Sequence, residues 1–241
     1  MGAFTTIFNH YFKRSLRNKM NYLMIAIPLG IILLNVAVAY NNIEEGVRLA
    51  DLPFMVVLVA LMTLSFQFFC SEILTEFLNL DIRGEVKWRL LVSPVQKSTY
   101  LMAIAAVSFI VSMLMGIVVF LVMLIGFRID FGGVHIWISV LTLMALVGHA
   151  CAVVIVLLAP SKKAASAISM IFAFAMMGVA GALPIPVNIL PDFIRTYNPV
   201  TLGTEAIVEG GALAVQNMGL LLAMFVGISV VAFVINRRVK I

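Results

Sequence analysis

Charged residues are scarce in this sequence. Aspartate, glutamate, lysine and arginine make up 11% of the 241 residues, whereas hydrophobic residues make up 63%. Soluble globular domains are about a quarter charged and about half apolar. The mean hydropathy of +1.14 points the same way. This composition excludes an ordinary soluble domain and indicates a protein embedded in a lipid bilayer.

Cysteine is rare and the common catalytic motifs are missing. Cys70 and Cys151 both lie in apolar runs, which predicts small buried side chains rather than a disulfide framework or a metal site. The sequence contains no G-x-S-x-G, H-E-x-x-H or G-x-x-x-x-G-K-[ST] motif. EEGVR at 44–48 is similar to part of a glutamate protease motif, but it lies in a short loop. We therefore expect neither a catalytic site nor a cofactor in this chain.

Six runs reach the roughly 20 apolar residues that a membrane-crossing helix needs. They lie at 22–40, 53–71, 101–127, 134–159, 164–183 and 213–235. They predict an all-α integral membrane protein with six transmembrane helices in one domain, 1–241. AVAY at 37–40 resembles a signal-peptidase site, and cleavage there would leave five spans; our interpretation is a retained first span.

Basic residues are divided unevenly between the connections. Only Arg48, Arg128 and Arg195 follow spans one, three and five. The other lysines and arginines lie in the two terminal segments and after spans two and four. Because loops rich in lysine and arginine stay in the cytoplasm, we predict that both termini are cytoplasmic. The net charge of +5 then reflects topology and does not indicate a nucleic-acid partner.

The six runs contain no charged residue. Ion-coupled transporters keep ionisable groups at membrane depth, so any transport here must draw its energy from another chain. We interpret His149, inside the fourth run, as a hydrogen-bonded packing residue, with a proton site as the alternative. The polar span residues Asn35, Thr63, Ser65 and Gln67 are expected to bond between helices, with contact to a cargo as the alternative. Glu72 and Glu76 are expected to carry the second helix onward into water.

The first 21 residues have an amphipathic pattern. Phe4, Phe8 and Phe12 recur at helical spacing on one face, while Lys13 and Arg17 lie opposite. This predicts an interfacial helix in the membrane plane, with basic side chains toward anionic headgroups. A simple topology anchor is the alternative interpretation.

The connection 72–100 is too long and too patterned for a plain turn. A helix is predicted over 80–93, with Ile82, Val86 and Leu90 on one face. Pro94 pushes the preceding residue out of helical conformation and ends this helix. One face would meet the bundle and another a partner; a solvated, charged loop is the alternative.

The apolar segment 183–211 holds four of the eight prolines. Apolar sequence interrupted by proline predicts short helices that lie in, or re-enter, the outer leaflet. Its charged residues are expected to face water: Asp192, Arg195, Glu205 and Glu209.

These last two segments resemble the type-2 ABC (ATP-binding-cassette) exporter permeases. EVKWRLLVSPVQKSTYLMA at 85–103 is similar to the family's charged run followed by L-L-x-x-P. ILPDFIRTYNPVTLGTEAI at 189–207 is similar to its LP, short helix, NP and E-A-[IL] pattern. The chain lacks the large extracellular domain of some members, and Val208-Glu209 stands where an arginine is usual.

The resemblance implies a half-transporter in a bacterial or archaeal cell membrane. A second permease subunit, identical or related, would complete the pathway. Two ATPase subunits would bind ATP and Mg and would move the coupling helix at 80–93. The expected ATPase contacts are Arg83, Glu85, Lys87, Trp88, Arg89 and Leu90. The outer segment is marked by Pro184, Pro191, Asn198, Pro199 and Glu205.

The cargo is inferred only from the lack of charge in the spans. An uncharged pathway favours a hydrophobic or amphipathic drug, antibiotic or peptide. The alternatives are a permease for polysaccharides or lipid-linked glycans and a non-transporting membrane immunity protein. An intramembrane enzyme would need a nucleophile or metal set that the sequence lacks.

Overall fold

The computed structural model describes residues 2–41, 53–83, 95–129, 131, 133–183 and 191–238. Within these ranges the chain is helical and contains no strand. The helices are α1 (Ala3–Arg17), α2 (Lys19–Asn41), α3 (Pro53–Cys70), α4 (Glu72–Arg83), α6 (Lys97–Leu121, continued by the π-helical turn η2, Val122–Gly126), α7 (Val134–Leu158), α8 (Lys162–Val179), α9 (Asp192–Thr196), α10 (Pro199–Glu209) and α11 (Gly211–Arg238).

Six helical stretches are long and apolar enough to cross a membrane, which confirms the predicted number of spans. They are Asn21–Val38, Phe54–Leu80, Thr99–Gly126, Val134–Leu158, Lys162–Val179 and Gly211–Arg237. The second is longer than predicted because α4 continues α3 with little interruption. The backbone N–H of Thr75 donates to the Ser71 carbonyl at 3.2 Å, which carries the helical hydrogen bonds across the junction.

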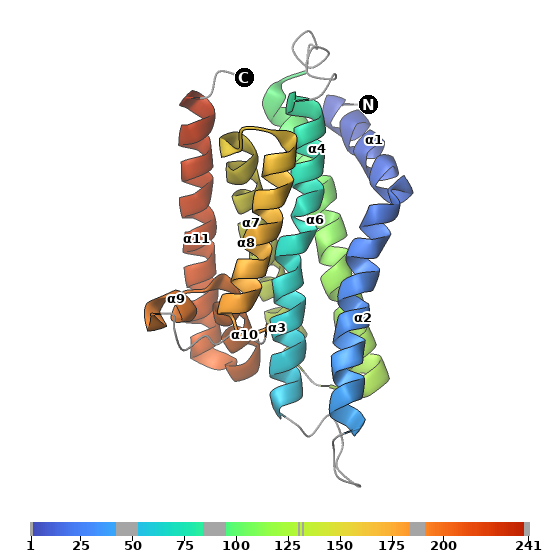
Figure 1. Ribbon diagram of the computed structural model, residues 1–241, viewed down its shortest axis with the longest axis vertical. Helices are drawn as coiled ribbons and strands as arrows, with labels where there is room; N and C mark the ends of the chain where they lie inside the picture. The colour runs from blue at the N-terminus through green and yellow to red at the C-terminus, as the bar shows by residue number, and fades with distance from the viewer. Residues whose placement is uncertain are drawn as a thin grey trace.

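The helices run side by side along one long axis (Figure 1). The terminal end of the bundle is the end at which α1 begins and α4 and α11 end. The distal end is the end at which α2 finishes and α9 and α10 lie (Figure 1). α4 ends and α6 begins at the terminal end, whereas α2 ends and α3 begins at the distal end (Figure 1).

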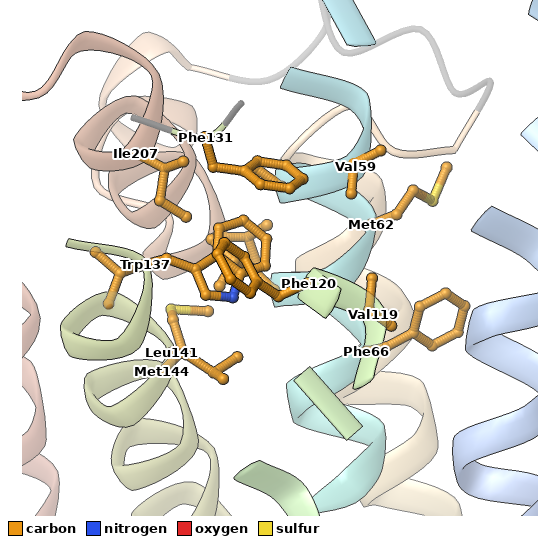
Figure 2. Close-up of a cluster of buried hydrophobic side chains, with 14 of the residues drawn as sticks. Val59, Met62, Phe66, Val119, Phe120, Phe131, Trp137, Leu141, Met144 and Ile207 are labelled. Atoms are coloured by element: carbon orange, nitrogen blue, oxygen red, sulfur yellow. The ribbon is translucent and has the colours of Figure 1, made fainter. Parts of the chain in front are cut away.

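A cluster of aromatic rings forms the core of the distal half (Figure 2). The ring centroids of Phe131 and Trp137 are 4.5 Å apart, and Phe120 lies 5.5 Å from each of them. All three side chains are at least 93% buried. Aromatic pairs at these separations add to the stabilisation that their burial provides.

A second core cluster fills the terminal half, around Tyr11, Phe77, Ile104 and Val156. It brings α1 onto α4 and α6. The predicted apolar face of α1 therefore packs partly on protein: Tyr11 is 5% exposed, and Phe8 and Phe12 are partly buried against the same cluster. The sequence pattern identified the apolar face of α1 correctly, but it did not show that the neighbouring helices cover part of this face.

The α4 helix corrects one expectation. Glu72 and Glu76 lie on a helical continuation of the second span, as expected, but they are only partly exposed. The apolar residues beside them are buried in the bundle: Ile73, Leu74, Phe77 and Leu78 are all 3% exposed or less. α4 packs against α6, α7 and α8. The apolar residues recur at helical spacing, so burial of this face outweighs the cost of carrying two carboxylates into the bundle.

Candidate functional site

The predicted ATPase-contact residues fall at the edge of the described chain. Arg83 is the last residue of α4, at the terminal end of the bundle. The other five ATPase-contact residues lie outside the described residues: Glu85, Lys87, Trp88, Arg89 and Leu90. Pro184 of the outer segment also lies outside them. Residues 80–83 of the predicted coupling helix continue α4 without a break. α4 therefore connects the predicted contact segment directly to the bundle interior.

Polar side chains link α4 and its neighbours inside the bundle. Gln67, at the end of α3, donates its amide to the Ser112 carbonyl on α6 at 3.3 Å, and the Ser112 hydroxyl donates back to the Gln67 amide oxygen. Eight residues after Gln67, and nearer the terminal end, the hydroxyl of Thr75 on α4 lies 3.2 Å from the hydroxyl of Ser169 on α8. The first pair of bonds joins α3 to α6, and the second contact joins α4 to α8.

Other polar side chains of the spans form hydrogen bonds within their own helix. The Thr63 hydroxyl donates to the Val59 carbonyl and the Ser65 hydroxyl to the Leu61 carbonyl, each at 2.7 Å on the same helix. The expectation of bonding between helices therefore holds for Gln67 and is wrong for these two. It is also wrong for Asn35, whose amide donates to the Ile31 carbonyl of its own helix at 2.8 Å. A hydroxyl that bonds back to the preceding turn needs no partner helix.

His149 is held by two partners. Its Nδ1 atom lies 2.6 Å from the Ala145 carbonyl oxygen, and its Nε2 lies 2.9 Å from the Ser108 hydroxyl on α6. A carbonyl oxygen only accepts, so Nδ1 carries the hydrogen and the hydroxyl donates to Nε2. Both ring nitrogens are thus occupied by protein groups, as expected of a packing residue.

Glu72 is less exposed than its charge predicts. It lies inside the second span, and its carboxylate is close to the hydroxyls of Ser166 and Ser169 on α8. Its Oε2 is buried without a partner among the described residues. Two turns along α4, Asn79 is fully buried and neither of its amide atoms has a partner there. A buried polar group without a partner is costly and calls for an explanation.

α1 is fastened to the terminal half by polar and aromatic contacts. The Tyr11 and Tyr100 hydroxyls hydrogen-bond to each other, and the Tyr11 ring lies 5.3 Å from that of Phe77. Arg14 places its guanidinium 5.6 Å from the centre of the Phe77 ring. At the end of α1 the Asn18 amide reaches the Glu76 carboxylate at 3.4 Å. A displacement of α4 would therefore be transmitted to α1.

The outer segment combines an exposed helix with a buried one. α9 begins after Pro191, and its residues from Asp192 to Thr196 are exposed. α10 is capped by Asn198, whose side-chain oxygen accepts from the Val200 N–H at 2.8 Å, and Pro199 fits the first turn because it needs no N–H partner there.

α10 is packed into the bundle. The Asn198 amide donates to the Met176 carbonyl of α8 at 3.1 Å, and Gly203 sits so close to α3 that a Cβ there would lie 2.8 Å from Leu64. Glu205 is half-buried and accepts from the Asn217 amide at 3.2 Å. Of the four charged residues expected to face water here, Glu205 is thus engaged with α11, while Asp192, Arg195 and Glu209 are exposed.

The described residues show no arrangement suited to covalent or metal chemistry. No group of three or more histidine, cysteine, aspartate or glutamate side chains in this part of the chain could hold a metal ion. What the geometry offers instead is a set of membrane helices joined by a few polar contacts.

The comparison with protein families gives one result. The model of a family described as "ABC-2 type transporter" matches residues 2–210 of the 241. The match runs from α1 through α10 and includes the segments 84–94 and 184–190. No match is found among curated proteins.

Proposed function

Because this chain belongs to the ABC-2 type transporter family, it is a membrane permease subunit of an ABC transporter, and we propose that it exports a hydrophobic or amphipathic cargo such as a drug, an antibiotic or a peptide. The observation that supports this cargo class is the placement of charge. Apart from Glu72 and Glu76, the charged residues of the described spans lie at their ends, such as Lys162, Lys163 and Arg237. A charged cargo would need compensating groups at membrane depth.

The energy of ATP hydrolysis would be transmitted to the permease through the segment after α4. Permeases of this family work with ABC ATPases, and we place the docking surface on Arg83, Glu85, Lys87, Trp88, Arg89 and Leu90. This placement is supported by the position of Arg83 at the terminal end of α4. Since α4 packs against α6, α7 and α8 and α1 packs on α4 and α6, a push on α4 would reach most of the bundle.

The orientation follows from the same charges. Of the described residues, the basic side chains of α1 and Lys162, Lys163 and Arg237 belong to the terminal end, and Arg128 and Arg195 to the distal end. The excess of basic residues supports a cytoplasmic terminal end. ATP, with Mg, would then be bound by the ATPase on that side.

A second permease subunit would complete the transporter, and two ATPase subunits would drive it. The outward faces of α2 and α11 are available for a second permease subunit, because they are apolar and exposed over much of their length, with Leu34 at 64% and Val230 at 56%. Such faces are covered either by lipid or by another subunit.

The position of the distal aromatic residues argues against the alternative cargo, a polysaccharide. A permease for polysaccharides would be expected to place aromatic side chains along its pathway. Trp137, Phe120 and Phe131 are instead packed against each other in the core (Figure 2). This favours the drug, antibiotic or peptide cargo over the polysaccharide alternative.

Site-specific photocrosslinking tests the proposal. Benzoyl-phenylalanine would replace Trp88 in the predicted docking segment or, as the control, Phe193 on the exposed α9 at the distal end. With the ATPase expressed alongside, position 88 should give a permease–ATPase crosslink and position 193 should not. Crosslinking at position 193 but not at 88 would contradict both the docking surface and the orientation.

A further inference from the structure

An apolar groove lies at the terminal end of the bundle, between α11 and the helices α4, α6 and α7. Its volume is about 320 Å³. Leu74 and Leu78 of α4 form part of its lining and are 1% and 3% exposed, whereas Met102 of α6 and Phe233 of α11 are 65% and 56% exposed. The groove therefore has a buried floor and opens on the outer surface of the bundle.

Every residue that lines the groove belongs to a candidate membrane span. Its occupant must therefore come from the bilayer and not from the aqueous phase. A helix of a second subunit does not fit, because one turn of a helix about 10 Å across already occupies about 400 Å³. A slender apolar chain is the kind of molecule that matches the space.

A positive charge lies at the terminal mouth of the groove. Arg237 places its guanidinium 4.5 Å from the centre of the Phe233 ring, so the charge is held over a residue of the groove wall. Asn236 adds a polar side chain to the lining at the same end. In the sequence, Lys97 begins α6 one turn before Leu101, another lining residue.

From this juxtaposition we infer that the groove binds one acyl chain of an anionic phospholipid, with its phosphate at Arg237. Lipid tails are as apolar as leucine, so burial alone gives no preference for the groove over bulk lipid. The preference comes from the headgroup, because a basic residue near a membrane surface attracts anionic lipid. The groove lining shares no residue with the Thr75–Ser169 contact of α4 with α8 or with the predicted ATPase-contact set, and the inference does not depend on the proposed cargo.

Native mass spectrometry of the full-length chain purified in detergent tests the inference. Dioleoyl phosphatidylglycerol is titrated, with dioleoyl phosphatidylcholine as the headgroup control because its chains are identical. Arg237→Gln removes the charge, and Met102→Trp places a large ring over the groove. The matched controls are Arg195→Gln at the distal end and Met170→Trp on the exposed face of α8. Thermal unfolding of all four variants establishes that they are folded.

The wild-type chain should bind phosphatidylglycerol more tightly than phosphatidylcholine. Arg237→Gln should weaken phosphatidylglycerol binding by about fivefold, which corresponds to the attraction of one basic residue to an anionic surface. Met102→Trp should remove one bound lipid, and both controls should match the wild type. Equal binding of the two lipids, or equal loss in variants and controls, would overturn the inference. So would a Met102→Trp variant that binds lipid normally but no longer binds a hydrophobic cargo, because the groove would then be a cargo site.

Discussion

His149 on α7 accepts a hydrogen bond from the hydroxyl of Ser108 on α6, with 2.9 Å between Nε2 and the hydroxyl oxygen. Its other ring nitrogen donates to the Ala145 carbonyl of its own helix. The histidine therefore fastens two spans together in the interior of the bundle, and neither ring nitrogen is left to exchange a proton with a cargo.

A double-mutant cycle tests this role of His149. We expect Ser108→Ala and His149→Leu each to lower the free energy of unfolding, with a coupling energy of about 0.6 kcal/mol, the average for hydrogen bonds between membrane helices. Thermal unfolding in detergent measures it. Transport by His149→Gln should keep the pH dependence of the wild type. Loss of that dependence in a stable variant would establish a proton site instead.

Asn198 supports a prediction that separates its two hydrogen bonds. Asn198→Ala should lower the free energy of unfolding by about 1 kcal/mol for the lost cap of α10, and further for the lost bond to Met176. Asn198→Asp keeps an oxygen for the Val200 N–H and loses only the amide donor. Its thermal stability should lie between those of Asn198→Ala and the wild type; two equally unstable variants would show that the cap contributes nothing.

The sequence was sufficient to predict the six spans because each one needs a long apolar run, and such runs are visible without a structure. It failed at α4, where apolar residues alternate with Glu72, Thr75, Glu76 and Asn79. That pattern fits a surface helix as well as a buried one. The partners that decide between them, Ser166 and Ser169, lie on α8, about ninety residues away in the chain.

The same limit applies to the outer segment and to the groove. The prolines predicted short helices, and α9 and α10 are present, but only the structure shows that Gly203 allows α10 to approach α3 and become buried. The groove joins residues from four helices that are distant in sequence, so no local pattern marks it. The burial of α10 and the shape of the groove both depend on contacts between segments that are distant in the sequence.

Glu72 should be replaceable by glutamine with a gain in stability. Glutamine has the same shape without the charge, so it removes the cost of burying a carboxylate whose Oε2 has no partner among the described residues, and it keeps an oxygen near the hydroxyls of Ser166 and Ser169. A gain of about 1 kcal/mol would raise the melting temperature by about 2–4 °C in a chain of this size.

Glu76→Gln is the matched control for Glu72→Gln, one turn further along α4. Glu76 accepts from the Asn18 amide, so loss of its charge should leave stability unchanged or slightly reduced. A Glu72→Gln variant that melts below the wild type would contradict our account of the buried carboxylate and would assign Glu72 a structural partner not yet identified.

Tyr11 should be the residue on which the docking of α1 depends most. Tyr11→Phe removes the bond to the Tyr100 hydroxyl and should cost about 1 kcal/mol. Tyr11→Ala also removes the ring that packs on Phe77 and should cost about 3–5 kcal/mol. Thermal unfolding measures both, and Asn9→Ala, on the exposed face of α1, is the control. Similar melting temperatures for Tyr11→Ala and the control would show that α1 is not held by this contact.

The central claim is that a partner ATPase drives this permease through the segment after α4. The most direct measurement is cargo transport and ATP hydrolysis in proteoliposomes that hold the permease and its ATPase. Trp88→Ala combined with Arg89→Glu should reduce the cargo moved per ATP by about tenfold or more, because tryptophan and arginine commonly dominate the binding energy of an interface. Arg195→Glu, at the distal end, should transport as the wild type does. Full coupling in the double variant would contradict the account.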